Sequence, residues 1–77
     1  MEIEWEQGFC IRVTAEGGEV VISANRAGLL SLAKQFTALA DGQPGGHIHY
    51  DRWNSLEDDS AEMIVELVKD DGDSTGA

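Results

Sequence analysis

The 77-residue sequence contains few of the residues that support covalent cross-links or membrane insertion. It has a single cysteine, Cys10, which excludes a disulfide within the chain and is typical of a reducing compartment. No apolar run approaches the roughly 20 residues that a membrane-spanning helix needs. The opening residues, Met-Glu-Ile-Glu-Trp-Glu, lack the basic segment that begins a signal peptide. We therefore expect a cytoplasmic protein that does not contact the membrane.

Basic residues are also scarce. There are 5 Lys and Arg against 15 Asp and Glu, which gives a formal net charge of −10. Such a surface repels nucleic acid and anionic lipid, and it attracts basic proteins over a long range. The acidic charge therefore either keeps a small protein soluble or guides a basic partner to it. Nucleic acid is not expected as a partner.

The short chain also limits the size of the core. A single domain of this length buries only about 60% of the surface that its unfolded chain exposes. Association of two copies would extend the core, so a homodimer is one expectation. We predict one domain over residues 1–69. Residues 70–77 have almost nothing to bury and are expected to form a disordered acidic tail.

The first part of the chain has the pattern of a β-hairpin. Apolar side chains occupy most odd positions of residues 1–16, which predicts a strand with one buried face and a kink or a break at Gln7-Gly8. The following Gly17-Gly18 pair can take the positive φ angles of a two-residue hairpin turn. In that register Val13 lies opposite Ile22 and Ala15 opposite Val20, so both strands place apolar residues on the same side.

The predicted helix lies within residues 22–42. Six apolar residues there lie three or four positions from another member of the set, which is the pattern of one helix face: Leu29, Leu32, Ala33, Phe36, Leu39 and Ala40. Ser23 and Asn25 can both cap the first turn, and Asp41-Gly42 is typical of a helix end. We expect this stripe to cover one face of a sheet.

Two further strands are predicted after the helix. Residues 47–51 alternate between polar and apolar side chains, and residues 62–68 place Met63, Val65 and Leu67 on one face; a connector over residues 52–61 joins the two strands. The order is thus strand, strand, helix, strand, strand, which predicts a small α+β domain with a four-stranded antiparallel sheet and one helix on one face. Antiparallel pairing throughout allows the spatial strand orders 1-2-4-3 and 2-1-3-4. The sequence does not choose between them.

One cluster invites a chemical interpretation. His47, His49 and Asp51 lie on one side of the third predicted strand, where two histidines can chelate zinc and Glu62 or Glu66 can complete the shell. The alternative is that these side chains bind their neighbours or a partner on the outer sheet face. No nucleophile is paired with a base. Arg12 can lower the pKa of the nearby Cys10 thiol somewhat, but Cys10 is expected to be a small filler residue. We predict no enzyme activity and no cofactor.

Several segments in sequence order resemble one protein family. These are Val21–Ala40, then Gly46-His-Ile-His-Tyr-Asp51, then Leu56-Glu-Asp-Asp-Ser60 and Met63-Ile-Val-Glu-Leu67. Together they resemble the immunity protein 32 family of bacterial polymorphic toxin systems. The resemblance implies a small cytoplasmic α+β protein that binds and neutralises a cognate toxin domain. It also implies that His47, His49 and Asp51 are signature positions, without assigning them a role.

The sequence thus supports three hypotheses. The first is an immunity-type protein whose acidic surface binds a basic toxin domain, such as a nuclease. Its expected contacts are His47, His49 and Asp51, with Trp53 and the acidic pair Asp58 and Asp59 from the connector. The second hypothesis is a metal-binding protein or hydrolase built on the His47, His49 and Asp51 cluster. The third is a structural dimerisation module that uses the outer sheet face.

Overall fold

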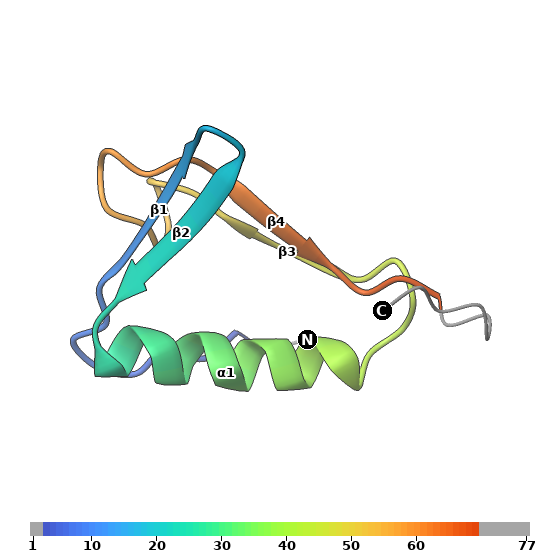
Figure 1. Ribbon diagram of the computed structural model, residues 1–77. Coiled ribbons are helices and arrows are strands. Elements are labelled where there is room, and N and C mark those ends of the chain that lie inside the picture. Colours follow the sequence, from blue (N-terminus) through green and yellow to red (C-terminus); the bar gives the residue numbers. More distant parts are fainter. Residues whose placement is uncertain (1–2, 70–77) are drawn as a thin grey trace.

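The computed structural model describes residues 3–69 of the chain. Its elements are β1 (Ile11–Glu16), β2 (Glu19–Ala24), α1 (Arg26–Ala40), β3 (His47–Tyr50) and β4 (Met63–Glu66) (Figure 1). The predicted α+β class and ββαββ order are thereby confirmed. The tail predicted over residues 70–77 lies outside the described residues. In the described range, no helix is long and apolar enough to cross a bilayer.

The predicted β1–β2 hairpin is confirmed together with its register. Val13 is opposite Ile22 and Ala15 is opposite Val20 in an antiparallel pair. The turn consists of Gly17 and Gly18, whose φ angles are 60° and 84°. Side chains other than glycine rarely adopt such angles, so the two glycines determine where the chain reverses.

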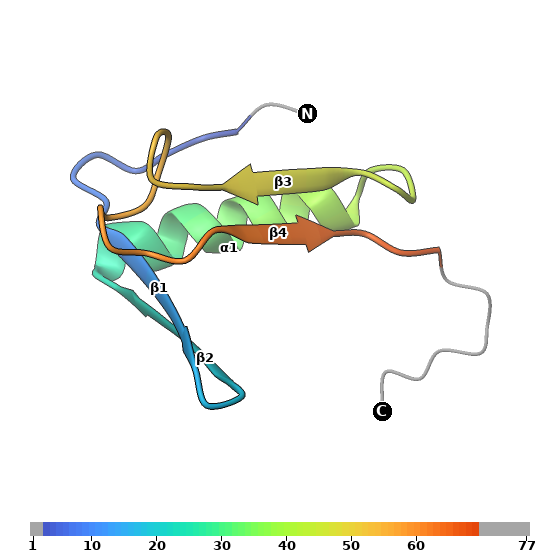
Figure 2. The same ribbon diagram turned by 90° about the horizontal axis from the view of Figure 1, so that it is seen from above.

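The four strands form two two-stranded sheets, β1–β2 and β3–β4, and not the single four-stranded sheet that we predicted. Both predicted orders also need a central pairing between these hairpins, which no strands of the described part make. An irregular segment occupies the second edge of β1 instead. The N–H of Glu57 donates to the Ile11 carbonyl (2.9 Å), and the N–H of Ala61 donates to the Val13 carbonyl (2.8 Å). Figure 2 shows the β1–β2 hairpin diverging from β3 and β4.

Residues 3–10 form no strand, so the predicted first strand is shortened to β1, and of the kink or break predicted at Gln7-Gly8 the structure shows a break. The chain breaks near Gly8, whose φ is 81°, and the preceding segment runs along α1. There the N–H of Glu6 donates to the Ser31 hydroxyl at 2.7 Å. The apolar side chains of this segment therefore pack against α1 and β3 rather than on the face of a sheet.

Helix α1 begins and ends where its capping residues predict. Of the two candidates, Asn25 is the N-cap, and its Oδ1 accepts from the N–H of Gly28 at 2.8 Å. The same oxygen accepts from the N–H of Cys10 at 3.0 Å, which joins the helix start to the chain entering β1. Asp41 is the C-cap.

The buried face of α1 is rotated away from the predicted stripe. Leu32 and Leu39 are buried as expected, but Leu29, Ala33, Phe36 and Ala40 are exposed, and the buried face is completed by Gly28, Ser31 and Gln35. Ser31 and Gln35 are buried because their side chains bind the N-terminal segment, and Gln35 also binds the core. Gln35 Nε2 donates to the Glu4 carbonyl at 2.7 Å, and Gln35 Oε1 accepts from the Tyr50 hydroxyl at 2.7 Å.

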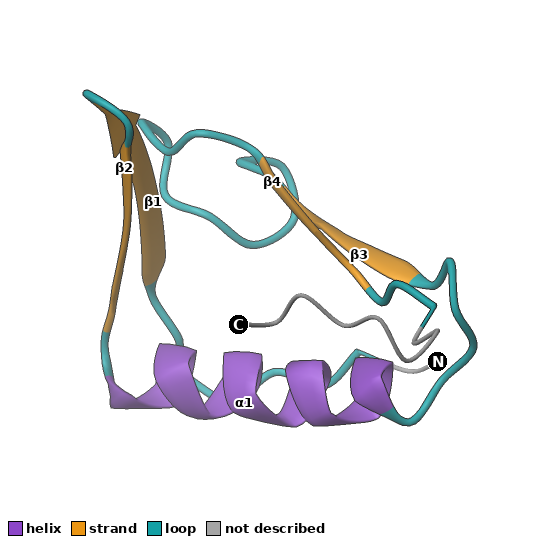
Figure 3. Ribbon diagram, turned by 45° about the vertical axis from the view of Figure 1, so that its right-hand side comes forward, coloured by secondary structure: helices purple, strands orange, loops and turns teal. Residues whose placement is uncertain are grey.

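The core lies between α1 and the inner faces of both hairpins. Its buried apolar residues are Ile11, Val13, Leu32, Leu39, Ile48, Tyr50 and Leu56. Figure 3 shows β1–β2 rising from the start of α1 and β3 following its end. In the connector between β3 and β4, Leu56 is buried and Trp53 is 82% exposed.

Candidate functional site: a protein-binding surface

The outer face of β3–β4 displays the predicted histidines. Burial alternates along β3, so His47 and His49 are exposed while Ile48 and Tyr50 enter the core. Across the sheet His47 is paired with Glu66 and His49 with Ile64. Ile64 is 61% exposed, so this face combines imidazole, carboxylate and apolar groups. Such a mixture is typical of surfaces that bind proteins.

His47, His49 and Asp51 are not arranged as the ligands of one metal ion. Their ring centroids are 4.9 Å apart in an edge-to-face arrangement, and His47 Nδ1 lies 3.1 Å from the Gly45 carbonyl oxygen. Over residues 3–69, no group of three or more His, Cys, Asp or Glu side chains is placed to hold a metal ion. A zinc site needs at least three such ligands, so the donors described here do not fit one.

Asp51 organises the turn that follows β3. Its Oδ1 accepts from the N–H groups of Trp53 (2.9 Å) and Asn54 (3.0 Å). Its carbonyl oxygen accepts from the N–H groups of Ser55 (3.0 Å) and Leu56 (2.9 Å). This is the arrangement in which aspartate side chains stabilise turns. It places Leu56 in the core and turns Trp53 outward.

Trp53 is the most exposed large apolar side chain in residues 3–69, at 82%. The Arg52 guanidinium carbon lies 5.3 Å from its ring centroid, a distance at which a cation–π interaction forms. The ring is thus held by its own neighbour while its outer surface faces solvent. Exposed tryptophans at such positions often dominate the energy of protein interfaces.

Asp58 and Asp59 are both exposed at the end of the connector. Asp59 Oδ1 accepts from Arg12 Nε at 2.9 Å, and this hydrogen bond raises the pKa of the Arg12 guanidinium. The ion pair fixes the end of the connector against β1. Sequence reasoning did not include Arg12 in the site, because no local pattern links residues 12 and 59.

Acidic residues are frequent in the segment that contains Trp53 and β4, and Glu66 lies opposite His47. Six of the 15 carboxylates lie between residues 51 and 66: Asp51, Glu57, Asp58, Asp59, Glu62 and Glu66. The residues that line a hollow of about 340 Å³ include His49, Asp51, Glu62 and Ile64. We use the name acidic face for the surface formed by His47, His49, Asp51, Trp53, Asp58 and Asp59 with these neighbours. Sequence reasoning had considered Glu62 only as a metal ligand. The strand register, which pairs Ile64 with His49, was the signal that could have added Ile64 to the site.

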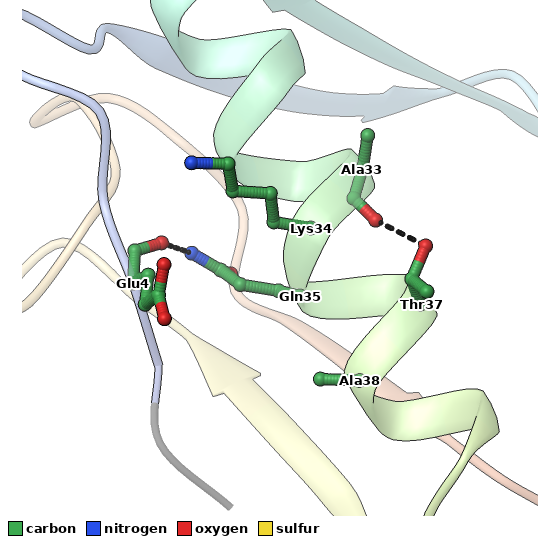
Figure 4. A pocket seen from close by; sticks show the side chains of 6 residues that line it. All are labelled: Glu4, Ala33, Lys34, Gln35, Thr37 and Ala38. Atoms are coloured by element: carbon green, nitrogen blue, oxygen red, sulfur yellow. Dashed lines mark hydrogen bonds between the residues drawn. The ribbon is translucent and has the colours of Figure 1, made fainter.

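A second pocket, of about 460 Å³, lies between the N-terminal segment and α1 (Figure 4). It is lined by two alanines and by polar residues, and two of its polar side chains bind within the protein. Gln35 donates to the Glu4 carbonyl, and the Thr37 hydroxyl donates to the Ala33 carbonyl at 2.9 Å. The lining contains no histidine or cysteine. It offers no nucleophile–base pair.

Cys10 is exposed, yet its surroundings do not activate it. Desolvation and the Glu57 carboxylate raise the pKa of the thiol and outweigh the lowering effect of Arg12. Arg12 thus lowers the pKa of the thiol as expected, but the net shift is upward. A thiol of raised pKa remains protonated at neutral pH and is a weak nucleophile.

Comparison with known families gives one match, and comparisons with curated proteins and with solved structures give none. The family described as Immunity protein 32 matches residues 19–68. The matched region runs from the start of β2 beyond the end of β4, so it contains the helix, the turn after β3 and all six predicted contact residues. It covers well over half of the chain. The chain therefore belongs to the immunity protein 32 family.

Proposed function

We propose that this protein binds a cognate cationic toxin domain through the acidic face and thereby neutralises it. Membership of an immunity protein family supports a role in toxin neutralisation. The observation that carries the choice of surface is Trp53, an exposed aromatic ring in the segment of residues 51–66, which contains six of the 15 carboxylates. An aromatic anchor in a charged surround is the usual composition of a tight heterologous interface.

The charge of the chain supports a partner of opposite sign. A net charge of −10 produces a field that attracts a cationic protein well beyond contact distance. A nuclease fits this requirement because it must carry basic groups to bind the phosphate backbone of its substrate. An acidic inhibitor competes with nucleic acid for those same groups. We therefore place the protein in the bacterial cytoplasm, within a polymorphic toxin system, where it acts by binding without catalysis.

The acidic face is divided by role. Carboxylates at its rim, such as Asp58, guide the toxin and remain partly hydrated, so each contributes little to the final affinity. Trp53 and His49 lie closer to its centre, where contact with the toxin removes water from them. Asp51 acts indirectly, because its hydrogen bonds hold Trp53 in its outward position.

Co-expression with the toxin domain encoded beside this gene tests the proposal. The protein should restore growth and should co-purify with the toxin. Trp53→Ala should weaken binding by at least about tenfold, while Leu30→Ala, an exposed apolar residue on α1, should leave the affinity unchanged. Failure to bind or neutralise the toxin would overturn the proposed function. If both Trp53→Ala and His49→Ala leave binding tight, the toxin contacts a different surface.

A further inference from the structure

The apolar stripe of α1 is only half covered. Four exposed apolar residues, Leu29, Ala33, Phe36 and Ala40, follow one another at spacings of four, three and four, so they form one row along the helix. Leu29 is 54% exposed and Phe36 is 37% exposed. The N-terminal segment does not cover this row, because it binds Ser31, Lys34 and Gln35 on the other flank of the helix.

Strand β2 adds a second uncovered apolar surface. Val20 and Ile22 are 65% and 39% exposed. They belong to the same sheet face as the buried Val13, which is opposite Ile22. In the described part of the chain, β2 pairs only with β1. Figure 2 shows the free edge of β2 turned away from β3 and from the N-terminal segment.

The free edge of β2 can be assigned to particular residues. The N–H of Asn25 donates to the Cys10 carbonyl at 3.1 Å, so the pair 10–25 is a hydrogen-bonded one. Hydrogen-bonded pairs alternate along an antiparallel ladder. The N–H and C=O groups of Val20, Ile22 and Ala24 therefore point away from β1. The same residues that expose apolar side chains also present backbone groups for a further strand.

The charge of this surface differs from that of the rest of the molecule. Residues 20–40, which contain most of β2 and all of α1, include no Asp or Glu, although the chain has 15 of them. Their only charged side chains are Arg26 and Lys34, and Lys34 forms an ion pair with Glu6. We use the name acid-free face for the surface formed by Val20, Ile22, Leu29 and Phe36.

We propose that a second copy of this chain docks on the acid-free face, with the two β2 strands side by side and antiparallel. A twofold contact joins the same patch of both subunits, and two chains of charge −10 repel each other least where neither carries a carboxylate. A cationic toxin would be drawn to the acidic face instead. Residues 70–77 have no large apolar side chain with which to cover this surface. This inference goes beyond the proposed function and does not depend on it.

Sedimentation of the full chain, without toxin, tests the proposal. We expect a monomer–dimer equilibrium over micromolar concentrations that shifts toward the dimer as salt is added, because salt screens the repulsion between two acidic chains. Leu29→Glu and Val20→Glu should each raise the dissociation constant at least about tenfold, since they place carboxylates in an apolar contact. The matched control is Val68→Glu, at an apolar residue that is 70% exposed beyond the end of β4, which should leave the equilibrium unchanged.

Because Val20 and Leu29 are exposed, their substitution should leave the fold intact. Circular dichroism of each variant checks that it is folded. The Val20 and Leu29 variants lie on different elements, so one remains informative if the other fails to fold. A wild-type chain that stays monomeric at high concentration and high salt would overturn the proposal. So would a dimer that both variants retain, or a toxin that binds the acid-free face of a monomeric wild-type protein.

Discussion

At the scale of single residues, Gln35 determines much of how α1 faces the core. Its side chain is 2% exposed and joins three parts of the chain: the helix, the N-terminal segment at Glu4 and β3 at Tyr50. A glutamine on a helix surface would normally face water. Here both of its polar atoms are paired, so its burial leaves no unsatisfied group.

Replacing Gln35 by leucine should destabilise the fold by about 1–3 kcal/mol, because the Tyr50 hydroxyl and the Glu4 carbonyl lose their partners. Urea unfolding measures the change. Gln43→Leu, at an exposed loop position, should change the stability by less than about 0.5 kcal/mol. Combining Gln35→Leu with Tyr50→Phe should recover part of the loss. Equal effects of the two leucine variants would contradict the role assigned to Gln35.

Tyr50 gives a pH prediction of defined sign. Burial raises the pKa of its hydroxyl from 10.0 to about 12, so the folded state holds the proton more tightly than the unfolded state. The corresponding stability is fully present below about pH 10 and is lost as the pH rises through about 12, by about 3 kcal/mol in all. Tyr50 is the only tyrosine, so tyrosinate absorbance reports it directly. Tyr50→Phe should remove this part of the alkaline loss, and a midpoint near 10 in the folded protein would refute the assignment.

At the scale of elements, the position of α1 depends on Gly28 as well as on apolar spacing. A Cβ atom on Gly28 would lie 2.6 Å from the Cys10 carbonyl oxygen and 2.9 Å from Ile11 Cγ1. The glycine therefore allows the helix to approach the chain that enters β1. This close approach turns Gly28, Ser31 and Gln35 inward and leaves Leu29 and Phe36 at the margin of the core.

A pair of leucine variants tests this rotation. Leu32→Ala should cost about 2–5 kcal/mol, because Leu32 is 4% exposed and its removal leaves a cavity. Leu29→Ala should cost less than about 1 kcal/mol when measured on dilute, monomeric protein, because Leu29 is 54% exposed. Thermal or urea unfolding compares the two. A larger loss for Leu29→Ala would restore the predicted stripe as the buried face.

The elements differ in how well the sequence predicts them. The β1–β2 hairpin follows from local information, since paired glycines and matched alternation determine both the turn and the register. Helix rotation and sheet pairing do not, because they depend on contacts distant in sequence, such as Gln35 with Glu4 and Ala61 with Val13. The six candidate contact residues followed from alternation and turn composition. The turn-stabilising hydrogen bonds of Asp51 and the ion pair between Arg12 and Asp59 could be identified only from the structure.

At the scale of the whole molecule, negative charge is distributed unevenly. Six carboxylates lie in residues 51–66, while residues 20–40 carry none. We assign the acidic face to a cationic toxin and the acid-free face to a second copy of the chain. The two contacts should respond oppositely to salt, because salt screens attraction in the first case and repulsion in the second.

The salt dependence of toxin association tests the central claim most directly. Charge steering can raise association rates from about 10⁵–10⁶ M⁻¹s⁻¹ to about 10⁸–10⁹ M⁻¹s⁻¹. Stopped-flow mixing with the toxin domain should therefore show association that slows steeply with salt and dissociation that changes less. Asp58→Asn should lower the association rate more than Asp41→Asn at the helix end, and Trp53→Ala should mainly raise the dissociation rate. An association rate that stays constant from low to high salt would contradict the account and would leave the acidity a role in solubility alone.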